Sequence, residues 1–254
     1  NGCDQPKHIF QINGESMGTT YSIKIVQNAN KTNIQSIEIG IDSVLHQINK
    51  QMSTWDPKSE ISVFNQWRSI KPYPVSDSLI TVVDKAISIS KKTQGLFDVT
   101  VYDLMSLWGF GPNPKTGMPS MSEVDKVLSS TGYGKIKIYK NTIIKTHPLV
   151  KLDLNAIAKG YAVDRVFKYI EEQGFDNIFV EIGGEVRSLG RNSLNDLWSI
   201  GIENPPGGEK LDKQLAAIVD LENNSVATSG NYRNIVNING DILGHTINPR
   251  TGYP

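Results

Sequence analysis

The sequence first suggests proton-transfer chemistry by a histidine near its end. His245 stands shortly before a stretch rich in turn-forming residues, Asn248-Pro-Arg-Thr-Gly-Tyr-Pro254. Imidazole is the side chain best suited to moving protons near neutral pH. Asn, Pro, Thr and Gly favour tight turns, which can fix the direction of a nearby side chain. His245 is therefore a candidate general base, and the alternative is a structural histidine.

A second segment that could carry chemistry is Lys151-Leu-Asp-Leu-Asn-Ala-Ile-Ala-Lys-Gly160. The pattern predicts a strand at 150–154 that leads into a helix over 155–173, capped by Asn155 and stopped by Gly174. The first turn of a helix presents N–H groups that suit a phosphate, and Lys159 adds positive charge. Asp153 is positioned to accept hydrogen bonds from a heterocycle or to orient the water of a cation. The alternative is an ordinary junction with a solvated lysine.

Two further positions favour contact with a ligand. Gly183 and Gly184 interrupt a predicted strand, which indicates a bulge or a place where a ligand approaches the backbone. Trp55 follows a predicted helix and could stack on a flat ring or pack in the core. Zinc-ligand spacing of His and Cys is absent, so any metal should be a hard ion with oxygen ligands, such as Mg²⁺. P-loop, Gly-x-Gly-x-x-Gly and Gly-x-Ser-x-Gly motifs are absent too.

The elements that must position these residues are strands and helices without strict alternation, which predicts an α+β fold. Helices are expected at 33–52, 77–94, 122–130 and 155–173. Strands are expected at 9–13, 19–26, 135–139, 142–145, 150–154, 177–188, 197–203, 215–222 and 233–239. Residues 1–8 form a polar arm, and 204–213 a Pro/Gly-rich loop. A boundary between lobes is expected near 112–120 or 146–150.

Composition excludes several classes of protein. The 254 residues contain 26 Lys and Arg and 26 Asp and Glu, and this balance argues against a nucleic-acid partner. No apolar run approaches the ~20 residues of a membrane-spanning helix. Cys3 is the only cysteine, so it forms no internal disulfide. Gly2-Cys3 is either the remnant of a lipoprotein signal, with a lipid tether on Cys3, or an incidental terminal thiol.

Several segments, taken in order, carry a resemblance to a known family. They are Met17–Lys24, Met52–Ser62, Gly95–Thr100, Trp108–Gly111, Leu152–Ala162, Val180–Glu185, Ala227–Arg233 and His245–Pro254. Each is weak alone, and together they are specific. The chain resembles the ApbE family of FAD-dependent flavin transferases from residue 17 to residue 254.

The resemblance implies a fold and an activity. The fold would be ApbE-like, also described as T-fold-like, with largely antiparallel sheets, packed helices and two lobes around a flavin cleft. The enzyme would cleave FAD, transfer FMN to a threonine hydroxyl of a target protein and release AMP, with Mg²⁺ as cofactor. Targets would be subunits of membrane redox pumps, such as Na⁺-translocating NADH:quinone reductase. Export as a lipoprotein is typical of the family, which places residues 1–8 as a tether at the periplasmic face of a bacterial membrane.

The resemblance also implies site residues by position. His245 corresponds to the base that deprotonates the acceptor threonine, and Ala156 to a metal ligand through its backbone carbonyl. The implied FAD contacts are Met17, Trp55, Leu96, Phe97, Asp98, Asp153, Lys159 and Ile247. Trp55 stands where relatives often have Tyr, and Asn248 where many have Asp.

The sequence also departs from the family in length. Family members continue past the Pro-Arg-Thr-Gly-x-Pro turn into a segment that supplies an Asp and a Thr as further metal ligands. Residues 9–254 are therefore expected to be a flavin transferase domain that lacks this segment and belongs to a longer protein. Two other functions stay open: an FAD pyrophosphatase that uses water as acceptor, and a non-catalytic flavin-binding lipoprotein.

Overall fold

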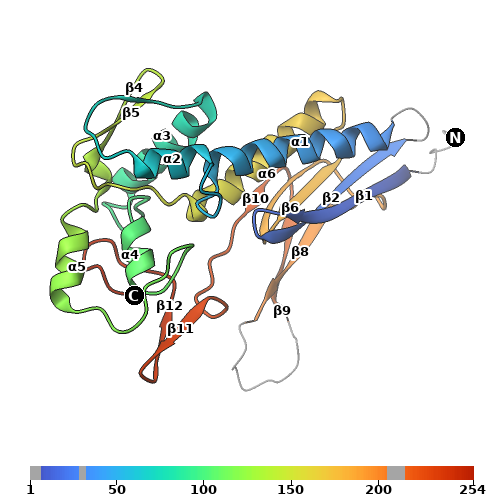
Figure 1. Ribbon diagram of the computed structural model, residues 1–254. Coiled ribbons are helices and arrows are strands. Elements are labelled where there is room, and N and C mark those ends of the chain that lie inside the picture. The colour runs from blue at the N-terminus through green and yellow to red at the C-terminus, as the bar shows by residue number, and fades with distance from the viewer. Residues whose placement is uncertain (1–6, 29–32, 205–214) are drawn as a thin grey trace, which may run out of the picture. The chain divides into compact units, whose positions relative to one another are not determined.

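The computed structural model describes residues 7–28, 33–204 and 215–254 (Figure 1). Cys3, most of the expected polar arm and most of the expected 204–213 loop lie outside these residues, whereas Lys7 and His8 belong to the first strand. The chain divides into two compact units. The first comprises residues 1–47 and 159–230, and the second comprises residues 48–158 and 231–254. The divisions therefore fall elsewhere than the boundaries expected near 112–120 or 146–150.

The first unit is built on a five-stranded sheet with the strand order β1-β2-β6-β7-β10. All its neighbouring strands run antiparallel. The strands are β1 (Lys7–Ser16), β2 (Thr19–Asn28), β6 (Ile178–Ile182), β7 (Glu185–Leu189) and β10 (Ser225–Val226). A separate antiparallel pair is formed by β8 (Trp198–Glu203) and β9 (Leu215–Leu221).

Both faces of the five-stranded sheet are covered. On one face, Tyr21 of β2 donates to Asp42 of helix α1 (Ile34–Met52), and Arg187 of β7 lies over the Phe167 ring of helix α6 (Asn155–Glu172). On the other face, Phe179 packs with Trp198 of β8 and with Leu221 of β9. The apolar residues of β6 therefore serve both faces, which explains its nearly unbroken apolar run.

The second unit contains short helices and two small sheets. Its helices are α2 (Glu60–Gln66), α3 (Asp77–Lys92), α4 (Tyr102–Leu107), α5 (Met121–Leu128) and the 3₁₀ turn Tyr133–Lys135. Its strands are β3 (Tyr73–Pro74), β4 (Ile136–Tyr139), β5 (Thr142–Lys145), β11 (Ile235–Ile238) and β12 (Asp241–Gly244). Side-chain caps begin three of these helices, at Ser59, Ser76 and Ser120.

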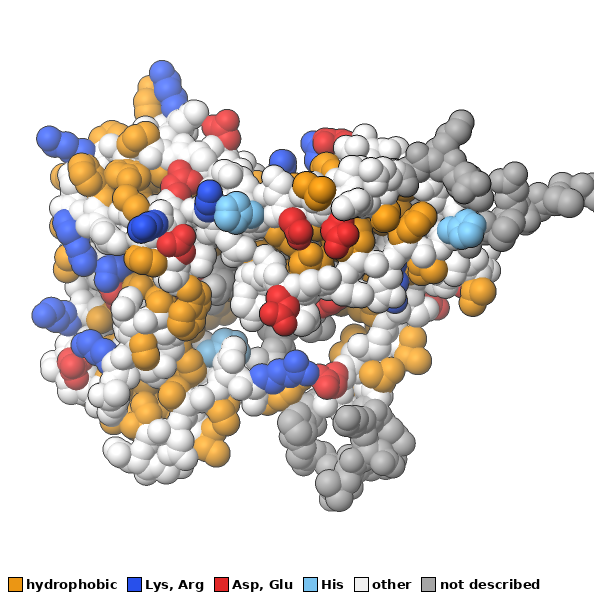
Figure 2. All heavy atoms as spheres, turned by 45° about the vertical axis from the view of Figure 1, so that its right-hand side comes forward, with side chains coloured by type: hydrophobic (Ala, Val, Ile, Leu, Met, Phe, Trp, Pro, Cys, Tyr) orange, Lys and Arg blue, Asp and Glu red, His pale blue; other side chains and the backbone are white. Residues whose placement is uncertain are grey.

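Helices α1 and α6 each contribute to both units, because the divisions at 47/48 and 158/159 fall inside them. Among the described residues, no helix is long and apolar enough to cross a membrane. Acidic and basic side chains both appear on the face drawn in Figure 2, in keeping with the equal numbers of the two kinds.

The sequence prediction of a strand at 150–154 is wrong. These residues belong to no sheet. The backbone N–H and C=O of Leu152 bond instead to the side chain of Asn65, and the N–H of Asp153 donates to Val99. The apolar pattern correctly indicated burial, but the hydrogen-bond partner is a side chain rather than a strand.

The glycine pair in the predicted strand 177–188 is a turn and not a bulge. Gly183 and Gly184 have φ values of 58° and 94°, and they join β6 to β7 as a hairpin. Two consecutive positive φ angles are typical of the two-residue turn that matches the twist of paired strands. The chain therefore reverses at this point, and Glu185 follows directly on the second strand.

A buried lysine joins β5 to the end of α2. Lys145 is almost fully buried, and its ammonium donates to the carbonyl oxygens of Phe64 and Trp67 at 3.0 and 2.8 Å. It also lies 4.4 Å from the centroid of the Phe64 ring. Burial lowers the pKa of Lys145 to about 8, and the positive charges of Arg68 and Lys151 act in the same direction.

This lysine should give the protein a measurable dependence of stability on pH. Between about pH 8 and about pH 9.5 the unfolded chain holds the Lys145 proton and the folded chain loses it, so the free energy of unfolding should rise by roughly 1–2 kcal/mol. Urea unfolding of the wild type and of Lys145→Met across this window checks the prediction. The rise should be missing in Lys145→Met, and equal slopes in both proteins would contradict it.

Candidate active site

The segment that precedes α6 holds Asp153 in a buried position. One carboxylate oxygen of Asp153 accepts a hydrogen bond from the N–H of Asn155 at 2.8 Å, so Asp153 rather than Asn155 supplies the side-chain acceptor at this helix start. Burial raises the pKa of Asp153 above its ordinary value, and the bond from Asn155 opposes that change. The two effects act in opposite directions on the same carboxyl group, and burial is the larger.

The first turn of α6 has fewer available N–H groups than the sequence suggested. Asn155 donates to Asp153, and Ile157 donates to the carbonyl of Leu154 at 2.9 Å. Ala156 is exposed in the same turn. The N–H groups of Asn155 and Ile157 are therefore already paired, and the first turn offers an anion fewer donors than expected.

The predicted flavin-contacting loop at Leu96, Phe97 and Asp98 is fixed mainly through Asp98. One carboxylate oxygen of Asp98 accepts from the N–H and the hydroxyl of Thr100 at 2.8 and 2.6 Å, and the other accepts from the N–H of Tyr133 at 2.6 Å. These three bonds give Asp98 a structural role in the loop. Leu96 is exposed beside it, where an apolar side chain is available to cover a ligand.

Hydrogen bonds join this loop to two other predicted segments. The carbonyl of Val99, next to Asp98, accepts from the N–H of Asp153 at 2.7 Å. The guanidinium of Arg250, in the last turn of the chain, donates to the carbonyl of Gln94. Within the second unit, the segment 95–100 and the adjacent Gln94 are thus connected to Asp153 and to Arg250, which come from two other segments that the sequence singled out.

Trp55 is exposed, so the core-packing alternative is wrong. Its side chain is 65% exposed. The turn that carries it is closed by hydrogen bonds, because the carbonyl of Ser53, before Trp55, accepts from the hydroxyls of Ser59 and Ser62, after it, at 2.6 and 3.3 Å. A large aromatic ring that is exposed on a firmly bonded turn is suited to stacking on a flat ligand.

The histidine near the chain end is oriented by a backbone carbonyl. Nδ1 of His245 lies 3.2 Å from the carbonyl oxygen of Asn234, and the His245 N–H donates to the same oxygen. Because a carbonyl can only accept, this contact fits the neutral tautomer with its proton on Nδ1, in which the lone pair is on Nε2. The Phe110 ring lies edge-on to the imidazole, with 6.3 Å between centroids. His245 is thus arranged as a proton acceptor through Nε2.

The turn after His245 is packed into the core of the second unit. Ile247 is buried with Leu104, Leu107, Trp108 and Val124. The Trp108 indole donates to the carbonyl of Gly252 at 2.6 Å, and Asn248 exchanges backbone hydrogen bonds with Tyr253 and Gly252, both at 2.8 Å. Ile247, which was predicted as a flavin contact, therefore also fixes the turn.

Two predicted flavin contacts, Met17 and Lys159, belong to the first unit. Met17 and Gly18 form the positive-φ turn between β1 and β2. Lys159 makes a 2.9 Å ion pair with Glu185, and its ammonium lies 3.4 Å from the carbonyl of Gly183. A Cβ on Gly183 would come within 2.8 Å of Thr19, so the two turns and Lys159 lie close together in this unit.

Glu185 and Asn65 belong to the site but could not be assigned to it from the sequence. The carboxylate of Glu185 partly neutralises the charge of Lys159. Its position directly after the glycine pair is the one sequence signal that could have indicated this role. Asn65 has no local signal at all, because its partner Leu152 is 87 positions away in the chain. The predicted metal ligand Ala156 is on the surface, and the described residues contain no group of three or more His, Cys, Asp or Glu that could hold a metal.

Comparison with known proteins gives consistent matches. The model of the ApbE family matches residues 17–254. An FAD:protein FMN transferase of Vibrio cholerae is 39% identical, over 100% of this chain and 75% of the relative. The solved flavin transferase ApbE from Vibrio cholerae superposes with a TM-score of 0.87 at 38% identity, covering 98% of this chain and 79% of that one.

A second solved structure gives the same result. The apo form of the flavinyl transferase ApbE from Pseudomonas stutzeri has a TM-score of 0.87 at 31% identity, over 98% of this chain and 76% of that one. Both the family model and these relatives span nearly all of the chain, including the segments that carry Asp153, Lys159 and His245. These matches show that the chain belongs to the ApbE family.

Proposed function

We propose that the protein transfers FMN from FAD to a threonine hydroxyl of an acceptor protein and releases AMP. The observation that carries this proposal is the match, along nearly the whole chain, to relatives named FAD:protein FMN transferase. The linked segments 95–100, 152–156 and 245–254 of the second unit support it, because they join a potential base to a buried carboxyl and to exposed apolar side chains.

The reaction assigns distinct tasks to the residues of the second unit. Trp55 and Leu96, both exposed, would cover the flavin ring, and Asp153 would accept hydrogen bonds from the bound dinucleotide. Nε2 of His245 would remove the proton of the threonine hydroxyl. The resulting oxygen attacks the phosphorus of the FMN half, a phosphoester bond forms, and the anhydride bond to AMP breaks. A hydroxyl needs such a base because it is a poor nucleophile while protonated.

Charge neutralisation is the other requirement of phosphoryl transfer. In the first unit, Lys159 supplies a positive charge that Glu185 holds at 2.9 Å, and this pairing would fix where the ammonium lies. Mg²⁺ dependence is part of the proposal, with the carbonyl of Ala156 as one ligand. Mg²⁺ prefers six oxygen ligands, so the described residues meet its requirement only in part, and no step is assigned to the ion.

Partners and location are further parts of the proposal. The acceptors would be threonine-bearing subunits of membrane redox pumps, and the equal numbers of acidic and basic residues agree with a protein rather than a nucleic-acid partner. A lipid on Cys3 would hold the enzyme at the periplasmic face of a bacterial membrane. Mass spectrometry of the N-terminal peptide from membrane fractions tests the lipid directly.

Incubation with FAD, Mg²⁺ and a threonine-bearing acceptor peptide should produce a fluorescent peptide that carries covalent FMN, together with AMP. The same peptide with Thr replaced by Val is the control and should stay unlabelled. Free FMN and AMP without labelling would support the pyrophosphatase instead. Intact FAD would support the non-catalytic flavin-binding protein.

His245→Ala should bind FAD as the wild type does and should lose transfer by about 100-fold or more, because a general base typically contributes 10²–10⁴-fold. His147→Ala is the matched control, since His147 lies in the second unit and contacts the N–H of Leu149. Single-turnover labelling of the peptide measures both variants. Labelling by His245→Ala at the wild-type rate would remove this histidine from the mechanism.

Lys159→Ala should weaken FAD binding about tenfold, because a charge-assisted contact to a phosphate is lost. Lys168→Ala is the matched control on the same helix, as Lys168 forms an exposed ion pair with Glu172. Titration of flavin fluorescence gives the two dissociation constants. An equal effect of the two substitutions would show that Lys159 does not contact the dinucleotide.

A further inference from the structure

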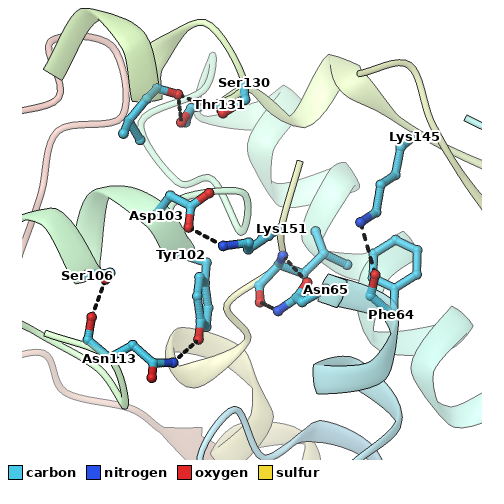
Figure 3. A network of polar contacts seen from close by, with 12 residues as sticks. Phe64, Asn65, Tyr102, Asp103, Ser106, Asn113, Ser130, Thr131, Lys145 and Lys151 are labelled. Carbon is cyan, nitrogen blue, oxygen red and sulfur yellow. Dashed lines mark hydrogen bonds and ion pairs between the residues drawn. The ribbon is translucent and has the colours of Figure 1, made fainter. Parts of the chain in front are cut away.

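Asn65 is a buried polar residue whose side-chain amide both donates to and accepts from one distant residue, Leu152. It stands near the end of α2 and is 5% exposed. Its Nδ2 donates to the carbonyl of Leu152 at 2.8 Å, and its Oδ1 accepts from the N–H of Leu152 at 2.7 Å. Figure 3 shows the amide facing the backbone beside Lys151. Both backbone polar groups of Leu152 are thus satisfied by a single side chain.

This arrangement fixes the residues that precede α6. Residues 150–154 belong to no sheet, so the Asn65 amide replaces the hydrogen bonds that a neighbouring strand would provide. The next N–H along, that of Asp153, donates to Val99 at 2.7 Å. Consecutive residues are therefore held from two elements, α2 and the loop at 95–100. Asp153 in turn accepts from Asn155, which immediately precedes Ala156.

Asn65 is itself held in place. The ammonium of Lys145 bonds to the carbonyls of Phe64 and Trp67, on either side of Asn65 in the chain. Phe64 is fully buried. The N-terminal end of α2 follows the turn that carries Trp55. The hydroxyls of Ser59 and Ser62, at the start of α2, donate to the carbonyl of Ser53 in that turn. One short helix thus connects the exposed tryptophan to the Leu152 backbone.

We propose that Asn65 is a positioning residue of the flavin site, which sets where the Asp153 carboxyl and the Ala156 carbonyl lie by holding Leu152. The proposal rests on the proposed function, because that function gives Asp153 and Ala156 their tasks. Asparagine suits this role because its amide combines one donor and one acceptor at the spacing of a peptide unit. An aliphatic residue would leave the buried N–H and C=O of Leu152 without partners, and aspartate would lack the donor.

The test compares Asn65→Ala and Asn65→Asp with the wild type in FAD titrations, which need neither metal nor acceptor. Both variants should weaken FAD binding by roughly 10–100-fold, the usual effect of removing a residue that orients a ligand-binding group. Hydrogen exchange should show faster exchange at the amides of Leu152 and Asp153. Asn65→Asp has nearly the same shape as asparagine, so it serves if Asn65→Ala fails to fold.

The matched control is Val83→Ala, which opens a cavity in the buried face of α3 in the same unit. It should lower Tm and leave the dissociation constant for FAD unchanged. If the Asn65 variants weaken FAD binding no more than Val83→Ala does, the inference is overturned. A wild type that binds FAD but never labels the acceptor contradicts the proposed function alone. A wild type that binds no FAD overturns both.

Discussion

The second unit depends on how the buried backbone at Leu152 and Asp153 satisfies its hydrogen bonds. Leu152 is fully buried, and an unpaired N–H or C=O at such a position costs about 1–3 kcal/mol. The chain meets this requirement with the Asn65 amide on one residue and the Val99 carbonyl on the next. The position of the α6 start, and of the carboxyl before it, follows from these bonds.

Packing of the final turn is a second constraint on the chemistry. The carbonyl of Asn234 orients the His245 ring. The position of its backbone in the second unit is set by the packing of Ile247 and by the hydrogen bond from Trp108 to Gly252. Gly252 has a φ of 79°, and a Cβ there would come within 2.6 Å of Val124. The candidate general base His245 thus lies in a segment that is fixed by packing and by a backbone hydrogen bond, as precise geometry requires.

Local periodicity predicted the regular elements well. The long helix at 34–52, the α3 helix and the strands on either side of Asn141 appear close to the expected bounds, because the helices satisfy their own backbone and the two strands pair with each other as neighbours in the chain. The failures involve partners that are distant in the chain. The strand expected at 150–154 bonds to Asn65, and α2 was missed because it is only seven residues long. The turn at the glycine pair could not be predicted, because its positive φ angles belong to the hairpin of β6 and β7.

The candidate site was less accessible to the same reasoning. Imidazole chemistry at His245 and the charge of Lys159 could be inferred from residue types, whereas Ala156 entered only through the family resemblance, since its side chain has no coordinating atom. The Lys159–Glu185 pair and the structural use of Asp98 could not be predicted, because each depends on a hairpin or turn that brings separate segments together.

The interleaving of the two units along the chain has a consequence for biosynthesis. The first unit includes residues up to 230, and the second unit includes residues 231–254, so the first unit is not complete before residue 230 has been made and the second follows it. Until β6 has been made, the emerging strands β1 and β2 lack this neighbour, and about 150 residues separate the end of β2 from the start of β6. Chaperones that bind nascent chains would recognise the exposed apolar face of β1 and β2 during that interval.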